Sequence, residues 1–163
     1  MASGNSLVAF GARAGVPAAS NGARHSLRNS HPILLFDTTT QQEVEFTGVL
    51  PRHYGGGGIT VYLHWTAASA TSGTIGWDVS FERMSDATTN LGSDSFATAQ
   101  TVTAATVAGT SGIMTVTNVA VTDGANIDGL TVGDSFRVRI RRDVANDTAT
   151  GDAELHAVSL KET

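Results

Sequence analysis

The chain has 163 residues, enough for one domain with a sizeable hydrophobic core. It contains no cysteine, which excludes disulfides and thiolate metal sites, and no apolar run is long enough to cross a bilayer. The net charge of −5 is uneven: residues 1–31 hold three arginines and no acid, whereas the remainder carries all fifteen acids and a net charge of −8. This asymmetry predicts a basic segment attached to an acidic body.

The opening segment, residues 1–32, shows no sustained period of a helix or of a strand. Gly, Ala, Ser and Asn dominate it, and Pro17 and Pro32 interrupt it. It contains too little apolar surface to offset its ordering entropy, so we predict a flexible N-terminal arm that becomes extended on a neighbouring protein. A plain disordered tail is the simpler alternative. The predicted partner-binding anchors of the arm are Leu7, Val8, Phe10, Arg13, Arg24 and Arg28.

From residue 33 onward, short runs of β-type residues are separated by turn residues. The clearest alternation of apolar and polar residues covers 59–66, 75–82 and 136–141. Weaker runs cover 33–36, 43–49, 98–104, 113–121 and 153–160. Helical signal is confined to a single turn at 94–100. Short connections without crossover helices predict an all-β fold over residues 33–163, an antiparallel jelly-roll-like β-sandwich of about eight strands; a barrel fits the same pattern.

Motifs for catalysis and nucleotide binding are missing: the sequence has no GxSxG, HExxH or GxxxxGK[ST]. The histidines include no HxH or HxxxH pair, so we expect no metal, no cofactor and no enzymatic activity. The glycine run 55–58 is followed by neither Lys nor a helix, which indicates a tight turn. Asp143, Asp147 and Asp152 could form a weak calcium loop, but their spacing matches no EF-hand, and a solvated hairpin is the simpler interpretation.

Arg137, Arg139 and Arg141 form a positive row on one face of a predicted strand, here called the arginine row. Like charges in one row repel unless acids on neighbouring strands or a partner neutralise them. The acids available for such pairing, within a subunit or across a subunit boundary, are Glu43, Glu45, Asp78 and Glu82. The acidic body disfavours nucleic acid as the partner. Tyr62 and His64 share the polar face of the strand 59–66, and together with the arginine row they are predicted as a subunit interface.

Three stretches, EFTGVLPRHYGGGGITVYLHW, ATSGTIGWDVSFERM and DSFRVRIRRDVANDTATGDAELHAVSLKET, resemble a group of small virion proteins of tailed phages. The similarity covers most of the chain, including the start MASGN, and contains no catalytic motif. The resemblance implies a jelly-roll-like capsid decoration (cement) protein. Such a protein would form a homotrimer on the outer capsid surface of the virion, contacting the major capsid protein and neighbouring subunits through its arms, without nucleic acid or membrane. The alternative is a tail-fibre module that binds a receptor or carbohydrate.

Overall fold

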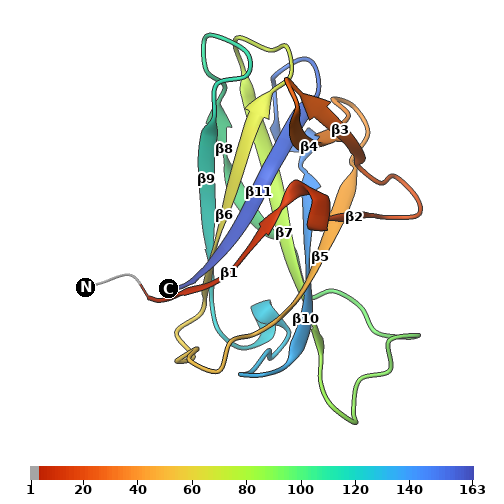
Figure 1. The fold of residues 1–163 in the computed structure, drawn as a ribbon, viewed down its shortest axis with the longest axis vertical. Helices are drawn as coiled ribbons and strands as arrows, with labels where there is room; N and C mark the ends of the chain where they lie inside the picture. Colours follow the sequence, from red (N-terminus) through yellow and green to blue (C-terminus); the bar gives the residue numbers. More distant parts are fainter. Residues whose placement is uncertain (1–3) are drawn as a thin grey trace.

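The computed structural model describes residues 4–163, which form two packed β-sheets with almost no helix (Figure 1). Sheet A runs across the strands β3 (Arg24–Arg28), β4 (His31–Phe36), β11 (Ala153–Glu162), β6 (Ile59–Ala67) and β9 (Thr115–Val121), and β1 (Ser6–Gly11) also pairs with β11. Sheet B runs across β2 (Val16–Pro17), β5 (Glu43–Val49), β10 (Ser135–Arg142), β7 (Thr74–Met84) and β8 (Gln100–Thr106). The predicted all-β antiparallel sandwich is confirmed, with eleven strands in place of about eight.

The eight runs predicted after residue 33 correspond to β4 through β11. Three 3-10 turns are also present: η1 (Ala12–Ala14), η2 (Ala125–Ile127) and η3 (Val144–Asn146). The helical turn predicted at 94–100 is wrong. Ala97 instead donates its backbone N–H to the carbonyl of Phe81 at 2.7 Å, which extends the pairing at the edge of β7 towards β8. Within residues 4–163 no helix is long and apolar enough to span a membrane.

The core lies between the two sheets, where the inward rows of the alternating strands meet. Trp65 of β6 and Trp77 of β7 are fully buried with ring centroids 6.3 Å apart, and Phe36 meets Trp77 edge-on at 5.0 Å. The indole N–H of Trp65 donates to the hydroxyl of Thr117 at 3.0 Å, so this buried donor is satisfied. Both tryptophans are therefore core residues, and neither offers an exposed stacking surface.

The prediction of a flexible N-terminal arm is wrong for the described residues, because β1 is a strand of sheet A. β4 pairs with residues 153–155 of β11 and β1 with residues 157–161, so the two strands share one edge of β11. Leu7 and Phe10 are 9% and 8% exposed and belong to the common core, where the Phe10 ring lies 5.4 Å from that of Phe46. The predicted boundary between residues 32 and 33 falls inside β4, which pairs with β3.

A bulge explains why β1 shows no strand period. The register between β1 and β11 shifts between Ser6 and Val8, which leaves Leu7 as the extra residue. As a result Leu7, Val8 and Phe10 all pack against the core, although a regular strand would alternate them between two faces. The next strand of sheet A in the chain, β3, is exposed along most of its length and so carries no apolar pattern at all.

Candidate functional site

A second bulge lies in β11 on the outer face of sheet A. The register between β11 and β6 shifts between Leu155 and Ala157, which leaves His156 as the extra residue. Leu155 is fully buried in the core, whereas His156 is partly exposed. A bulge of this kind turns a side chain away from its regular direction, and bulges are frequent next to functional sites. His156 therefore defines a first candidate position.

The side chains around this bulge form a connected polar network. Arg28 of β3 donates to both carboxylate oxygens of Glu154, at 2.9 and 3.1 Å, and to the carbonyl of Ala68 at 3.2 Å. The Thr66 hydroxyl donates to the same carboxylate at 2.6 Å and lies 2.9 Å from Nε2 of His156. Glu154 is buried, so these bonds compensate a charge that would otherwise be costly inside the sheet.

The network determines which nitrogen of His156 carries the proton. The Thr66 hydroxyl has one proton, which it donates to Glu154, so Nε2–H of His156 must donate to the hydroxyl oxygen. Nδ1 is then the free acceptor of the neutral ring. Burial lowers the pKa of His156, and the nearby His31, Arg28 and His64 lower it further, against the opposing effect of Glu154. The ring is accordingly neutral near pH 7 and presents a lone pair.

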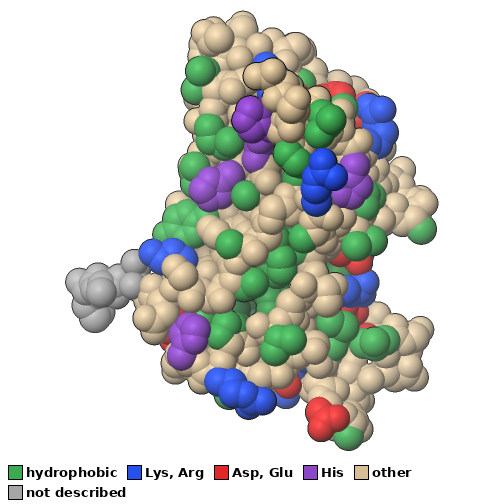
Figure 2. All heavy atoms as spheres, in the orientation of Figure 1, with side chains coloured by type: hydrophobic (Ala, Val, Ile, Leu, Met, Phe, Trp, Pro, Cys, Tyr) green, Lys and Arg blue, Asp and Glu red, His purple; other side chains and the backbone are tan. Residues whose placement is uncertain are grey.

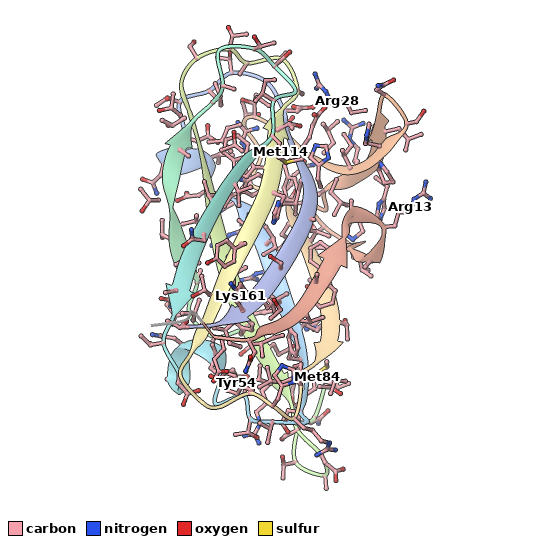
Figure 3. The ribbon with its side chains drawn as sticks, turned by 60° about the vertical axis from the view of Figure 1, so that its left-hand side comes forward. Arg13, Arg28, Tyr54, Met84, Met114 and Lys161 are labelled. Carbon is pink, nitrogen blue, oxygen red and sulfur yellow. The ribbon has the colours of Figure 1, made fainter. Side chains whose placement is uncertain are left out.

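A hollow of about 260 Å³ opens over this network, and we call it the bulge pocket. Its lining residues are Arg28, Asn29, His31, Thr66, Gly112, Met114 and His156. Arg28 and Met114 lie at the same end of the sandwich (Figure 3). The backbone of Gly112 has a φ of +81°, and a Cβ there would lie 2.4 Å from Nη2 of Arg28, so glycine is required where the loop passes the arginine.

The bulge pocket combines hydrogen-bond donors, acceptors and an apolar wall. The arginine donates, the neutral imidazole of His156 accepts, and the amide of Asn29 can do both, whereas the Thr66 hydroxyl already donates its one proton to Glu154. His31 Nδ1 lies 3.1 Å from the carbonyl of Arg28, so it donates there and leaves Nε2 as an acceptor in the neutral ring. A polyhydroxylated ligand has the same mixture of donors, acceptors and apolar C–H groups. The geometry therefore suits a sugar better than a purely apolar ligand.

Two other hollows lie elsewhere. One, of about 450 Å³, is lined by Arg13, His25, Ser26, Leu27 and Pro32 at the β3–β4 hairpin. The other, of about 490 Å³, is lined by Thr47, Met84, Ser85, Asp86, Ala87, Thr89, Leu91, Gly133, Asp134 and Ser135. Burial would raise the pKa of Asp134, but bonds from Thr131 and Arg83 outweigh it and lower that pKa. Neither hollow combines a bulge with a buried carboxylate network, so the bulge pocket is the stronger candidate.

Tyr62 and His64 lie further along β6 on the same outer face. His64 pairs with Ala157 of β11 and with Val116 of β9, and Tyr62 pairs one row further along. Figure 2 shows most of the visible histidine side chains on the upper part of the molecule, with hydrophobic side chains spread over the whole view. The structure thus places two of the predicted interface residues on the same face as the bulge pocket but outside its lining. Their role in a subunit interface stays a prediction.

The arginine row lies on the outer face of sheet B, and acids of the same chain neutralise it. Its ion pairs are Arg137 with Glu82 and with Glu45 (2.6 Å), Arg139 with Glu43 (3.6 Å) and Arg141 with Asp78 (3.0 Å). The hydrogen bond that Arg137 donates to the Glu82 carboxylate is the main reason that the pKa of Arg137 is raised. The Phe96 ring also covers the guanidinium groups of Arg137 and Arg139, at 4.8 and 4.5 Å. The predicted cross-strand pairing thus occurs within one chain. The role of the arginine row in a subunit interface stays a prediction.

Two of the three aspartates of the possible calcium loop make contacts within the chain. Asp147 lies 2.6 Å from Nε of Arg142, and both side chains are buried. Asp143 accepts a hydrogen bond from Asn146 at 2.6 Å. Among residues 4–163 no group of three His, Cys, Asp or Glu side chains is placed to hold a metal ion. A buried ion pair therefore holds the loop between β10 and β11 against the end of β10.

The predicted arm anchors are dispersed. Leu7, Val8 and Phe10 pack in the chain's own core, so they are not exposed anchors. Arg13 and Arg24 are exposed, and Arg28 is bound to Glu154. Of the residues at the bulge pocket and its network, the sequence indicated Arg28 alone, as an arm anchor, and it did not indicate Thr66, Met114, Glu154 or His156. One signal was present for His156: the buried apolar residues of the last strand fall at 153, 155, 158 and 160, and the three-residue step marks the bulge.

No protein-family model and no curated protein matches the chain. Solved structures do match its fold. CsCBM6-3 from Clostridium stercorarium, solved with cellobiose, has a TM-score of 0.53 at 10% identity, over 96% of this chain and 95% of that one. The CBM22-1 xylan-binding domain of Paenibacillus barcinonensis Xyn10C has a TM-score of 0.51 at 10% identity, over 98% and 95%. The chain has a jelly-roll fold like that of these carbohydrate-binding modules.

A third match covers only part of its partner. The Clostridium thermocellum xylanase 10B, comprising CBM22-1 and GH10 modules with xylohexaose, has a TM-score of 0.53 at 10% identity, over 100% of this chain and 29% of that one. Identities this low show the fold alone. None of the three is a virion protein, so the comparisons lend no support to the phage resemblance.

Proposed function

We propose that this chain is a non-catalytic carbohydrate-binding module whose ligand site is the bulge pocket. The observation that carries the proposal is the convergence of Arg28, Thr66, His31 and the bulged His156 on one hollow. The jelly-roll likeness to modules solved with cellobiose or described as xylan-binding supports the choice of ligand class. A receptor- or carbohydrate-binding module was the alternative in the sequence analysis.

The size of the pocket sets the size of the ligand. Its 260 Å³ lies just below the ~300–1,000 Å³ that is typical of small-molecule sites. One sugar ring at the end or branch of a glycan fits this volume better than a long buried oligosaccharide. Tyr62, which is partly exposed on the same face, offers an aromatic surface for a neighbouring ring. The expected affinity is modest, because the contact area is small.

A glycan and polysaccharide array that includes cellobiose, xylan and bacterial surface polysaccharides tests the proposal. We expect selective binding that His31→Ala and Met114→Ala each weaken several-fold, since both residues line the pocket and are exposed enough to be replaced without unfolding. His53→Ala is the matched control, because His53 contacts the backbone of Ser6, far from this pocket in sequence and outside its lining. Absence of binding across the array would refute the function, and binding unchanged by both pocket variants would refute the site.

A second candidate function is the structural virion role that the phage resemblance implies. The feature that favours it is a long segment without charged residues, residues 95–122, which suits contact between protein subunits. Attachment to a major capsid protein would then use the body of the sandwich, because residues 6–36 are built into its sheets. Locating the chain by imaging a virion, on the head, on the tail or not at all, tests this candidate directly.

A further inference from the structure

One long segment of the sandwich contains no charged residue. From Ser95 to Thr122 the sequence has no acidic or basic residue, no histidine and no proline. This segment contains β8 and β9, which are the edge strands of sheet B and sheet A and lie beside each other at one rim of the molecule (Figures 1 and 3). We call residues 95–122 the uncharged edge.

Within the uncharged edge, β9 has an unprotected side. Among residues 4–163 it pairs with β6 alone, in a one-to-one register from Thr115 to Val121 without a bulge. Edge strands are usually blocked by a charge, a proline, a bulge or a covering loop, because their free backbone groups bind other strands. The neighbouring edge strand β8 does have a register shift against β7. β9 is therefore the edge that can accept a further strand.

Exposed apolar side chains accompany β9. Ile113, Met114 and Val116 are 54%, 48% and 48% exposed at the start of the strand. Asn118 and Ala120 follow on the same outer face, and they are exposed as well. Apolar groups of this kind on an open edge gain from burial when the strand is paired. The surface thus offers both backbone hydrogen bonds and apolar contacts.

We propose that two copies of this chain pair through antiparallel β9 strands, which joins their A sheets into one continuous sheet. The argument for a second copy is electrostatic. Each chain has a net charge of −5, so two copies repel over most of their surfaces. At the uncharged edge no like charges meet, because β8, which accompanies β9, is equally uncharged. A self-complementary strand edge is the geometry of a two-fold dimer.

A two-fold pairing that uses the whole length of β9 has its axis at the middle of the strand. Asn118 is the middle residue of β9, and pairing centred there places Asn118 opposite its own copy and Val116 opposite Ala120. The two-fold axis is then perpendicular to the sheet, so the outer faces of both copies point the same way. Both bulge pockets would open on one side, which makes the dimer bivalent if they bind glycans as proposed. The pairing itself does not depend on that function.

Sedimentation equilibrium from low micromolar to several hundred micromolar chain tests the pairing. We expect the wild type to form dimers. Asn118→Asp and Asn118→Lys each place like charges opposite one another, and each should weaken dimerisation several-fold. A mixture of the two variants should associate more tightly than either alone, because opposite charges then meet across the axis.

Ser26→Asp is the matched control, since it adds the same charge to an exposed position of β3, at the other edge of sheet A. It should dimerise like the wild type, and urea unfolding should show that all variants remain folded. A wild type that is monomeric or trimeric at every concentration would overturn the proposal. So would an Asn118→Asp variant that dimerises normally, or a mixture no tighter than its components. Glycan binding by a strictly monomeric protein would leave the proposed function standing while removing the dimer.

Discussion

Replacing Phe10 by alanine tests whether the N-terminal segment is part of the sandwich. Phe10 is 8% exposed, and its ring lies 5.4 Å from that of Phe46 and 6.4 Å from that of Phe136. Removing a buried phenylalanine ring costs about 3–5 kcal/mol, the sum of lost transfer free energy and the cavity left behind. Among residues 4–163 β1 pairs with β11 alone, so the site can partly collapse, and we expect the free energy of unfolding to fall by about 3 kcal/mol.

Urea unfolding measures this loss directly. With a slope of about 1–3 kcal/mol per molar urea, 3 kcal/mol lowers the midpoint by about 1–3 M. Leu27→Ala is the control, because Leu27 lies in the same segment but is 59% exposed, and its loss should stay within about 0.5 kcal/mol. A Phe10→Ala midpoint no lower than that of Leu27→Ala would refute the packing of β1 and restore the flexible arm.

Three further changes test the buried polar groups. Asp147→Asn should lower the free energy of unfolding, measured in urea, by about 3–5 kcal/mol, because the fully buried Arg142 loses its charge partner. Tyr54→Phe should lower the free energy of unfolding by about 1–3 kcal/mol, because the buried N–H of Gly58 loses its acceptor. In the wild type, burial and Asp123 raise the pKa of Tyr54 to about 12, and spectrophotometric titration can measure this pKa. The free energy of unfolding should also decrease as the pH is lowered through 6.5. The pKa of His156 in the folded protein lies under this ordinary value, so the unfolded chain takes up the proton first and is favoured at low pH. His156→Gln should flatten this pH dependence.

Each of these expectations has a contrary outcome. A loss below 1 kcal/mol for Asp147→Asn would mean that the carbonyls around Arg142 suffice without a counter-charge. A Tyr54 hydroxyl that titrates at its ordinary pKa would show that it is not enclosed with Asp123. An unchanged pH profile in His156→Gln would show that the imidazole is not buried at the bulge.

The predicted strands were accurate where alternation was regular. In β6 and β10 apolar residues occupy every second position, because one face of each strand packs against the core and the other faces out. The arginine row illustrates the same logic, since a period of two also places Arg137, Arg139 and Arg141 on one face, within reach of acids on both neighbouring strands. Local pattern and tertiary structure agree in these strands.

Most residues of the candidate site could not be predicted from the sequence, because the site depends on strand bulges and on segments that are far apart in the chain. Arg28 and Glu154 are 126 positions apart in the chain, and only the pairing of β4 with both β3 and β11 brings them together. His156 reaches the pocket because one extra residue shifts the register of β11. A shift of this kind looks like lost periodicity in the sequence, and for β1 it was interpreted as disorder.

The sequence by itself determined the all-β class and the positions of eight strands, because both depend on residues that are neighbours along one strand. Only the tertiary structure decided that β1 completes sheet A and that a bulge directs His156 towards Arg28 and Thr66. The physical reason is that register and strand order are set by packing between remote segments. Residues within a single strand do not encode which strand lies beside it.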